Sequence, residues 1–187
     1  ISEPSEEEMI NIGINYACLI QLSQDMARHF LARNASLVYG GDLRPNGFTQ
    51  FLLEEAQALQ TRMRSREIHM KNFLAWPIYL NDTAEVKCWK TMHQQVAKMA
   101  DVEPPDEVID LIPSIDSYLQ PTNPQNIFVW SCCLTKMRNM MIDICDVRIC
   151  AGGRHFGYKG KMPGVLEEIK IAIEKERPIF LLGGFGG

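Results

Sequence analysis

The sequence lacks the features that mark several common protein classes. No apolar run approaches the roughly 18–20 residues that a membrane span needs, and no secretory signal opens the chain. The formal net charge is -4, and binding a duplex phosphate backbone usually requires a basic face. We therefore expect a cytoplasmic protein with no membrane segment in this chain and no duplex DNA as a partner.

Metal and standard nucleotide motifs are missing too. The six cysteines form no CxxC pair, and the four histidines show neither HExxH nor a Cys/His ligand spacing. We interpret the cysteines as reduced core thiols and expect no metal and no cofactor. GxGxxG is absent, and in GYKGKMPG the residue after Lys161 is Met162, which has no hydroxyl for magnesium. A standard dinucleotide fold and a kinase-like site are therefore disfavoured.

Helical segments and short apolar strands alternate along the chain. We predict helices at 5–33, 48–63, 127–144 and 163–176, strands at 36–39, 73–80, 147–150 and 179–182, and a helix followed by a strand within 81–102. Such alternation is typical of parallel βα units. We predict an α/β fold that is Rossmann-like and doubly wound, with a mainly parallel sheet and helices on both faces.

The chain length fits one globular domain. With 187 residues, 46% of them hydrophobic, residues 1–187 can bury a single sizeable core. Ile1 and Ser2 resemble the end of a strand, and the final GGFGG stands where a helix is expected to begin. We therefore expect a domain excised from a longer multidomain protein.

Three glycine-rich loops, at 40–49, 151–164 and 183–187, each follow a predicted strand. Loops at the carboxyl ends of parallel strands converge on one crevice, glycine allows close backbone approach, and helix N-termini present N–H groups to anions. We expect an anion-binding crevice. Its candidate residues in these loops and the adjoining helix starts are Gly40, Gly41, Asp42, Arg44, Thr49, Gly152, Gly153, Arg154, Lys161, Gly164, Glu167, Gly183 and Gly184.

Several of these residues have a simpler interpretation. Arg44 and Arg154 are either solvated loop cations or phosphate clamps, and Lys161 is either exposed or part of the cradle. Asp42 either caps a turn or binds a ribose hydroxyl. Carboxylates in the first turns of a helix stabilise its dipole, which is the alternative for Glu167 and for Glu168 beside it.

Four stretches together resemble a known family. They are LVYGGDLRPNGFT, LTKMRNMMIDICDVRICAGG, GYKGKMPGVLEE and RPIFLLGGFGG, and the resemblance covers nearly the whole chain. The chain resembles the SLOG superfamily, which includes the LOG phosphoribohydrolases and DprA-type domains. It is most similar to the SLOG sensor domain of Thoeris-type antiphage effectors, which binds a cyclic ADP-ribose isomer and switches on an attached effector.

The resemblance also implies roles for single residues. Arg138 matches the arginine that precedes the PGGxGTxxE motif of the LOG enzymes, Gly152 and Gly153 match its first glycines, and Glu168 matches its glutamate. Two departures matter: residues 154–163 separate the two halves of the motif, and Val165 replaces the threonine. The added cations suit a larger, polyphosphate ligand, and the insertion disturbs the geometry that a hydrolase needs.

The sequence therefore supports three hypotheses. The first is a cytoplasmic sensor that binds an ADP-ribose-type or other cyclic nucleotide without turning it over, with Glu168 accepting a ribose or base hydrogen bond. We expect it to form a homo-oligomer, joined partly through the 127–144 helix or through the helix that begins at Phe48. We also expect it to act with a fused or partner effector or TIR-type domain. The second is a LOG-like hydrolase of nucleoside 5'-monophosphates, in which Arg138 holds the phosphate and Glu168 stabilises the oxocarbenium ion. The third is a structural oligomerisation domain.

Overall fold

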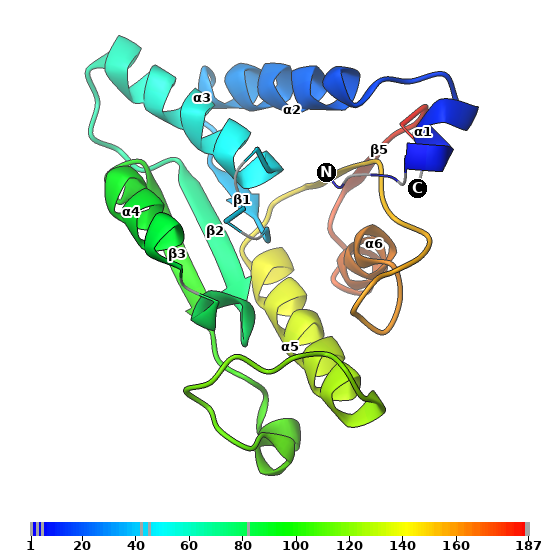
Figure 1. The fold of residues 1–187 in the computed structure, drawn as a ribbon. Helices are drawn as coiled ribbons and strands as arrows, with labels where there is room; N and C mark the ends of the chain where they lie inside the picture. Colours follow the sequence, from blue (N-terminus) through cyan, green and yellow to red (C-terminus); the bar gives the residue numbers. More distant parts are fainter. Residues whose placement is uncertain are drawn as a thin grey trace.

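The fold was analysed in a computed structural model that describes residues 2, 4, 6–41, 43–44, 46–81 and 83–185. Helices and strands alternate along most of its length (Figure 1). The strands are β1 (Leu37–Tyr39), β2 (Met70–Ala75), β3 (Ala97–Val102), β4 (Arg148–Ala151) and β5 (Ile179–Leu182). The α-helices are α1 (Glu6–Asn11), α2 (Tyr16–Leu31), α3 (Phe48–Met63), α4 (Ala84–His93), α5 (Pro124–Asp143) and α6 (Gly164–Glu174), with 3-10 turns at Ile78–Leu80 and Asp106–Leu111.

Every strand pairing in the described chain is parallel. The order β1-β2-β3 forms one sheet, and β4 pairs with β5 in a second. Ser2 adds a single parallel bridge to Gly152, just beyond the end of β4. The prediction of a parallel, Rossmann-like α/β fold is confirmed, although the described strands form two sheets rather than one.

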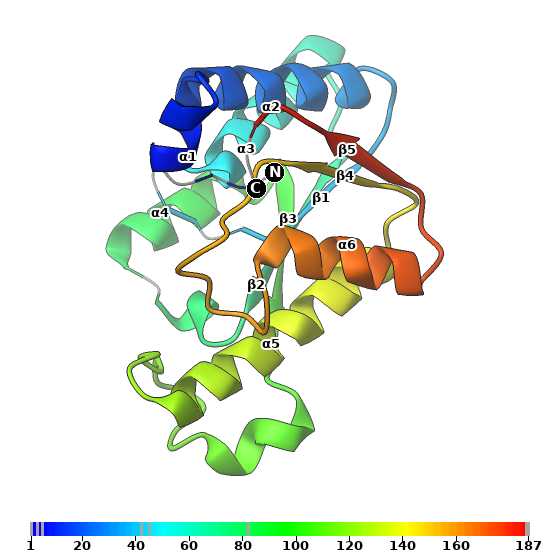
Figure 2. The same cartoon turned by 90° about the vertical axis from the view of Figure 1, so that its right-hand side faces the viewer.

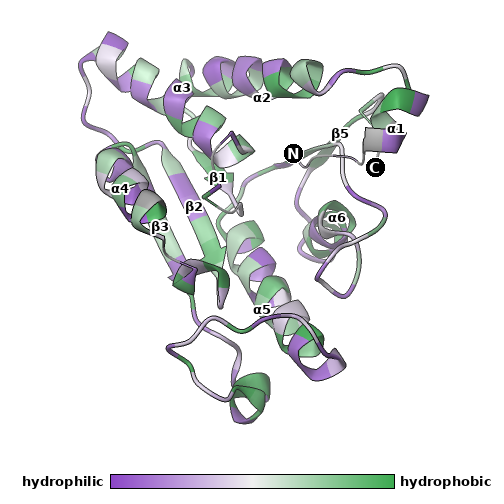
Figure 3. Cartoon of the chain, in the orientation of Figure 1, coloured by the Kyte–Doolittle hydropathy of each residue, from purple (hydrophilic) through white to green (hydrophobic). Residues whose placement is uncertain are grey.

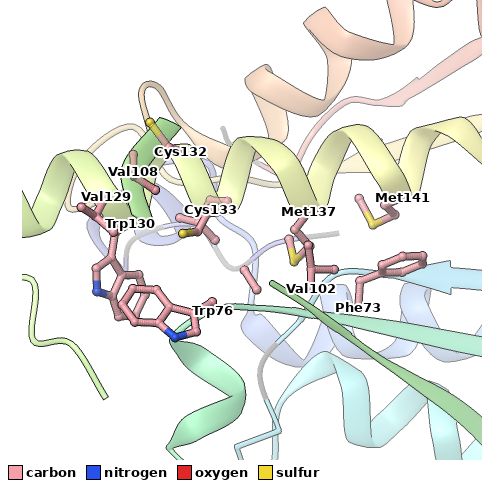
Figure 4. Packing of buried hydrophobic residues seen from close by; sticks show 12 residues of the cluster. Phe73, Trp76, Val102, Val108, Val129, Trp130, Cys132, Cys133, Met137 and Met141 are labelled. Carbon is pink, nitrogen blue, oxygen red and sulfur yellow. The ribbon is translucent and has the colours of Figure 1, made fainter. Parts of the chain in front are cut away.

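Helices cover both faces of the β1-β2-β3 sheet. Alternate side chains of β2 point to opposite faces, so each face packs with a different set of helices. Phe73 and Ala75 pack with the buried side of α5, where Met137 and Met141 reach toward the sheet (Figure 4). Met70, on the other face, packs with side chains of α2 and α3. Both α2 and α3 alternate between polar and apolar colour in Figure 3, as a helix with one buried side should.

The sequence placed most elements correctly and two incorrectly. The helix predicted at 5–33 is two helices, because the chain turns at Gly13, where φ is 70°, before Asn15 caps α2. The strand predicted at 73–80 is wrong at its end: β2 runs from Met70 to Ala75, and Pro77 then leads into a 3-10 turn. Proline has no N–H to give to a sheet, so it ends this strand.

The six cysteines are free thiols, and the prediction that they lie in the core is wrong for two of them. Cys132, Cys133, Cys145 and Cys150 are buried, while Cys18 and Cys88 are exposed. Burial raises the pKa of the Cys133 thiol to about 12, so it stays protonated at neutral pH. The buried cysteines therefore act as small apolar side chains of the core.

Two methionines test the packing of this core. Met137 of α5 is 3% exposed and Met92 of α4 is 68% exposed. Met137→Ala should lower the free energy of unfolding by about 2–4 kcal/mol, because it leaves a cavity beside the sheet. Met92→Ala, the matched control, should change it by less than about 0.5 kcal/mol. Urea unfolding measures both, and equal losses would contradict this packing.

Candidate functional site

The three glycine loops begin close together. The last strand residues before the loops turn away are Tyr39, Ala151 and Leu182, and all three pack in one apolar cluster. Leu19 of α2 and Phe48 of α3 complete the centre of this cluster. The carboxyl ends of β1, β4 and β5 therefore meet at one place, as the sequence predicts for a crevice in a parallel fold.

The first loop is fixed by contacts with its neighbours. The buried Asn72 of β2 donates a hydrogen bond from Nδ2 to the carbonyl oxygen of Gly41 at 3.0 Å. A Cβ on Gly41 would lie 2.6 Å from Oγ1 of Thr49, and one on Gly40 would lie 3.0 Å from Met137. Larger residues do not fit there, so the two glycines let the loop cross between α5 and the start of α3.

The guanidinium of Arg138, on α5, lies against the backbone of the loop that leads into α6. A Cβ on Gly160 would stand 2.9 Å from its Nη1, and a Cβ on Gly164 would stand 2.7 Å from its Nη2. Glycine at both positions allows the backbone to close over the guanidinium. The structure therefore places a cation beside the first residue of α6, where unpaired N–H groups and the helix dipole also favour an anion.

Two arginines and two glutamates form a buried network between α5, α6 and β4. Arg138 pairs through Nη1 with Oε2 of Glu167, whose Oε1 accepts a 2.5 Å hydrogen bond from the hydroxyl of Thr135. Arg148 pairs through Nη2 with Oε2 of Glu168. Nε of Arg138 lies 3.9 Å from Oε1 of Glu168, which joins the two pairs.

The network is tightly enclosed. The side chains of Arg138, Arg148, Glu167 and Glu168 are between 5% and 11% exposed. Burial lowers the pKa of Arg138, while the charge of Glu167 opposes that shift. The Nε groups of Arg138 and Arg148 have no hydrogen-bond partner in the described structure. A buried donor without a hydrogen-bond acceptor is uncommon in proteins and marks a place where an acceptor would be favourable.

The insertion at 154–163 lies mostly at the surface. Arg154 and Lys161 are exposed, and Phe156 at the tip is 85% exposed. Lys159 anchors the loop to α5, since its Nζ lies 4.5 Å from the ring centre of Trp130. Gly152 and Gly153 have positive φ angles of 64° and 152°, so the chain turns away from β4 there.

The remaining predicted residues lie nearer the edges of the site. Arg44 is exposed beside the first loop, and a Cβ on Gly47 would lie 3.1 Å from its Cγ. Gly183 and Gly184 are exposed, with open space around their Cα atoms. Asp42 lies outside the described residues.

Arg148, Thr135 and Asn72 contact other residues of the site but were not among the predicted residues. Arg148 stands in an otherwise apolar strand, and a charged residue in a covered strand nearly always has a buried partner. That signal was available from the sequence. Thr135 and Asn72 carried none, because single polar residues on helices and strands are ordinary.

No group of three or more His, Cys, Asp or Glu side chains in the described ranges could hold a metal ion. Within those same ranges, no helix has both the length and the apolar character to cross a membrane.

The chain matches a known protein family along its length. The family model described as SLOG cluster2 matches residues 1–187. No curated protein and no solved structure matched the chain.

Breaking a buried ion pair of this network should lower stability much more than breaking an exposed ion pair. Arg148→Met should lower stability by roughly 3–5 kcal/mol, because it leaves the charge of Glu168 buried without a partner. Adding Glu168→Gln should restore part of that loss. Lys170→Met breaks the exposed pair with Glu174, at 3.6 Å, and should cost less than about 0.5 kcal/mol. Equal thermal shifts for Arg148→Met and Lys170→Met would contradict the network.

Proposed function

Because the chain belongs to the SLOG family, as a member of its cluster 2, we propose that it is a sensor for a nucleotide-derived second messenger. The messenger is of the cyclic ADP-ribose type, and its binding regulates an attached or partner effector in antiviral defence, as in Thoeris-type systems. The placement of Arg138 at the N-terminus of α6, beneath a glycine loop, supports this proposal most directly.

The proposed phosphate position combines two attractive features. The guanidinium of Arg138 makes charge-assisted hydrogen bonds to phosphate oxygens, and the first N–H groups of α6 lie beside it. Arg138 is already paired with Glu167. A ligand phosphate therefore replaces Glu167 as its partner, which leaves Glu167 bound to Thr135 and changes the contact between α5 and α6.

The same geometry argues against turnover. In the hydrolase alternative, Glu168 must face the ribose of the substrate and stabilise its developing charge. Here the carboxylate of Glu168 is paired with Arg148 and enclosed between α6 and β4. One observation favours the alternative: Arg138 and Glu168 lie only 3.9 Å apart, so the two residues that a LOG-like enzyme uses are together.

Substituting two glutamates of α6 one at a time, one buried and one exposed, tests the proposed binding. Glu167→Gln removes the competitor for Arg138, so it should tighten binding of cyclic ADP-ribose isomers by about tenfold, or 1.4 kcal/mol. Glu174→Gln, exposed on the same helix, should leave the affinity unchanged. Arg138→Gln should weaken binding by about 1.5–3 kcal/mol. Titration calorimetry measures all three variants.

Two outcomes would count against the sensor. If no cyclic ADP-ribose isomer or ADP-ribose binds the wild-type protein at millimolar concentration, the proposed ligand class is wrong. If prolonged incubation with AMP releases adenine in proportion to enzyme, and Glu168→Gln abolishes the release, the hydrolase replaces the sensor. Chromatography of the free base decides this second point.

We propose in addition that the protein forms a homo-oligomer through α5. Four apolar side chains of this helix and its C-cap are between 41% and 50% exposed: Ile127 and Phe128 near its start, and Met140 and Ile144 at its end. Exposed apolar surface on a helix favours a partner, and methionine suits an interface that repacks between two states.

Light scattering with and without ligand measures this assembly. We expect a dimer at micromolar concentration, dissociated by Phe128→Asp with little loss of monomer stability. A wild-type monomer under both conditions would contradict the proposal.

A further inference from the structure

Charge is distributed unevenly along the chain. Residues 99–135 contain six Asp and Glu but no Lys or Arg, whereas residues 147–166 contain four Lys and Arg but no Asp or Glu. All six acids are exposed and lie between Asp101 and Asp116, and three of the four cations are exposed within the insertion at 154–163. The surface therefore has an acidic segment, residues 101–116, and a cationic insertion.

Each of these two surfaces has exposed apolar side chains among its charges. Phe156, which is 85% exposed, stands at the tip of the insertion, and Ile109 and Ile115 are exposed within the acidic segment. Ile109 belongs to a 3-10 turn, in which residues three apart share a face, so Asp106 stands beside it. An apolar centre with a polar rim is typical of surfaces that bind another protein.

Contacts of Trp130 show that the two surfaces are neighbours. The Nζ atom of Lys159 lies 4.5 Å from the centre of the Trp130 ring, and Nε1 of Trp130 donates a hydrogen bond to the carbonyl oxygen of Leu119 at 2.7 Å. Leu119 is three residues beyond the end of the acidic segment. One side chain of α5 therefore contacts both the insertion and the chain that follows the acidic segment. Figure 2 shows that chain and the start of α5 projecting together from one end of the molecule.

Cys132, on the same helix, is a second point where the two surfaces meet. Burial raises the pKa of its thiol, a contact with Glu107 raises it further, and the charge of Lys161 opposes the shift. An acid of the acidic segment and a cation of the insertion are thus close to one sulfur atom. The two oppositely charged surfaces lie side by side.

We propose that two copies of this chain bind about a two-fold axis, so that the insertion of each copy lies on the acidic segment of the other and Phe156 packs against Ile109 and Ile115. A two-fold interface uses the same surface on both copies. Since the cationic and acidic surfaces are adjacent, the rotation that places one insertion on its partner also forms the reciprocal contact. Each copy thus contributes one cationic and one acidic half of the interface.

A second copy fits these observations better than an anionic membrane does. Copies with a net charge of -4 repel one another when their charge is averaged over the surface. The proposed arrangement replaces that repulsion by two attractive contacts, and it disfavours orientations in which like charges meet. A membrane would attract the insertion but would repel the adjacent acidic segment, and Ile109 and Ile115 would stay in water.

The interface also includes the start of α5. Gln125, in the first turn of this helix, donates a hydrogen bond from Nε2 to the carbonyl oxygen of Leu111 at 3.3 Å, which joins the helix to the acidic segment. Ile127 and Phe128 follow directly and are exposed. The inference therefore rests on the proposed homo-oligomer and names the surfaces that meet in it. It does not depend on the nature of the ligand.

Charge reversal tests which surfaces meet. One variant carries Arg154→Glu and Lys161→Glu in the insertion, and the other carries Asp110→Lys and Asp116→Lys in the acidic segment. Each variant alone should be a monomer at concentrations where the wild type is a dimer, because surfaces of like charge then face each other. An equal mixture of the two variants should form a dimer again, because both of its contacts join opposite charges. Sedimentation of the full-length proteins without ligand measures this.

The sedimentation results separate this inference from the proposed homo-oligomer. If the wild type is a monomer, both are wrong. If both variants remain dimers on their own, the contact through α5 stands and this inference is wrong. It is also wrong if the variants are monomers and their mixture stays monomeric while circular dichroism shows that both are folded.

Two exposed phenylalanines provide a test that leaves the charges unchanged and decides the matter if a charge-reversed variant does not fold. Phe156 is 85% exposed, and Phe180 of β5 is 59% exposed. Phe156→Ser should raise the Kd of the dimer at least about tenfold, because it removes the apolar anchor of the interface. Phe180→Ser, the matched control, should leave the Kd unchanged. Equal effects of the two substitutions would overturn the proposal. So would a monomeric wild type that binds phosphatidylserine vesicles through Phe156, since a membrane would then be the partner.

Discussion

The position of α6 depends on four buried charges. Arg138 and Glu167, and Arg148 and Glu168, are enclosed where α5, α6 and β4 meet. Removing a charge from water costs several kcal/mol, and only a close opposite charge offsets that cost. The two pairs therefore fix the helix with respect to both neighbours, because a small displacement of α6 would leave two arginines without partners. The surrounding apolar contacts of Ile171 and Ala172 are less directional.

The loop that precedes α6 is shaped by the same network. The guanidinium of Arg138 occupies the space where side chains at 160 and 164 would stand, so the chain crosses it with glycine at both positions. The backbone and the cation are brought together at the start of a helix. This close approach gives the insertion at 154–163 a fixed base, while its tip, with Phe156, extends into solvent.

The sequence indicated the helices well because their apolar spacing is local information. The helix 48–63 was predicted with the bounds that α3 has, and the glycine loops were placed correctly after β1, β4 and β5. The partner of each charge could not be read in this way. Glu167 and Glu168 are neighbours on one helix, yet one pairs with α5 and the other with β4. That choice depends on how α6 is rotated, which is set by packing between elements far apart in the sequence. The division into two sheets depends in the same way on contacts that no local pattern records.

Charge balance links this network to the proposed sensing role. Two arginines and two glutamates sum to zero, so the buried network by itself carries no excess positive charge to hold a phosphate. A phosphate that pairs with Arg138 must displace Glu167, and the displaced carboxylate keeps only the hydroxyl of Thr135 and whatever water reaches it. Leaving a carboxylate partly uncompensated in a buried place is costly, and the cost falls if α6 moves to expose it. In the proposed sensor, binding and movement of α6 are therefore coupled by the same interaction that holds the helix in place without ligand. A site with surplus cations would bind the anion more strongly and would transmit less of that binding to the rest of the fold.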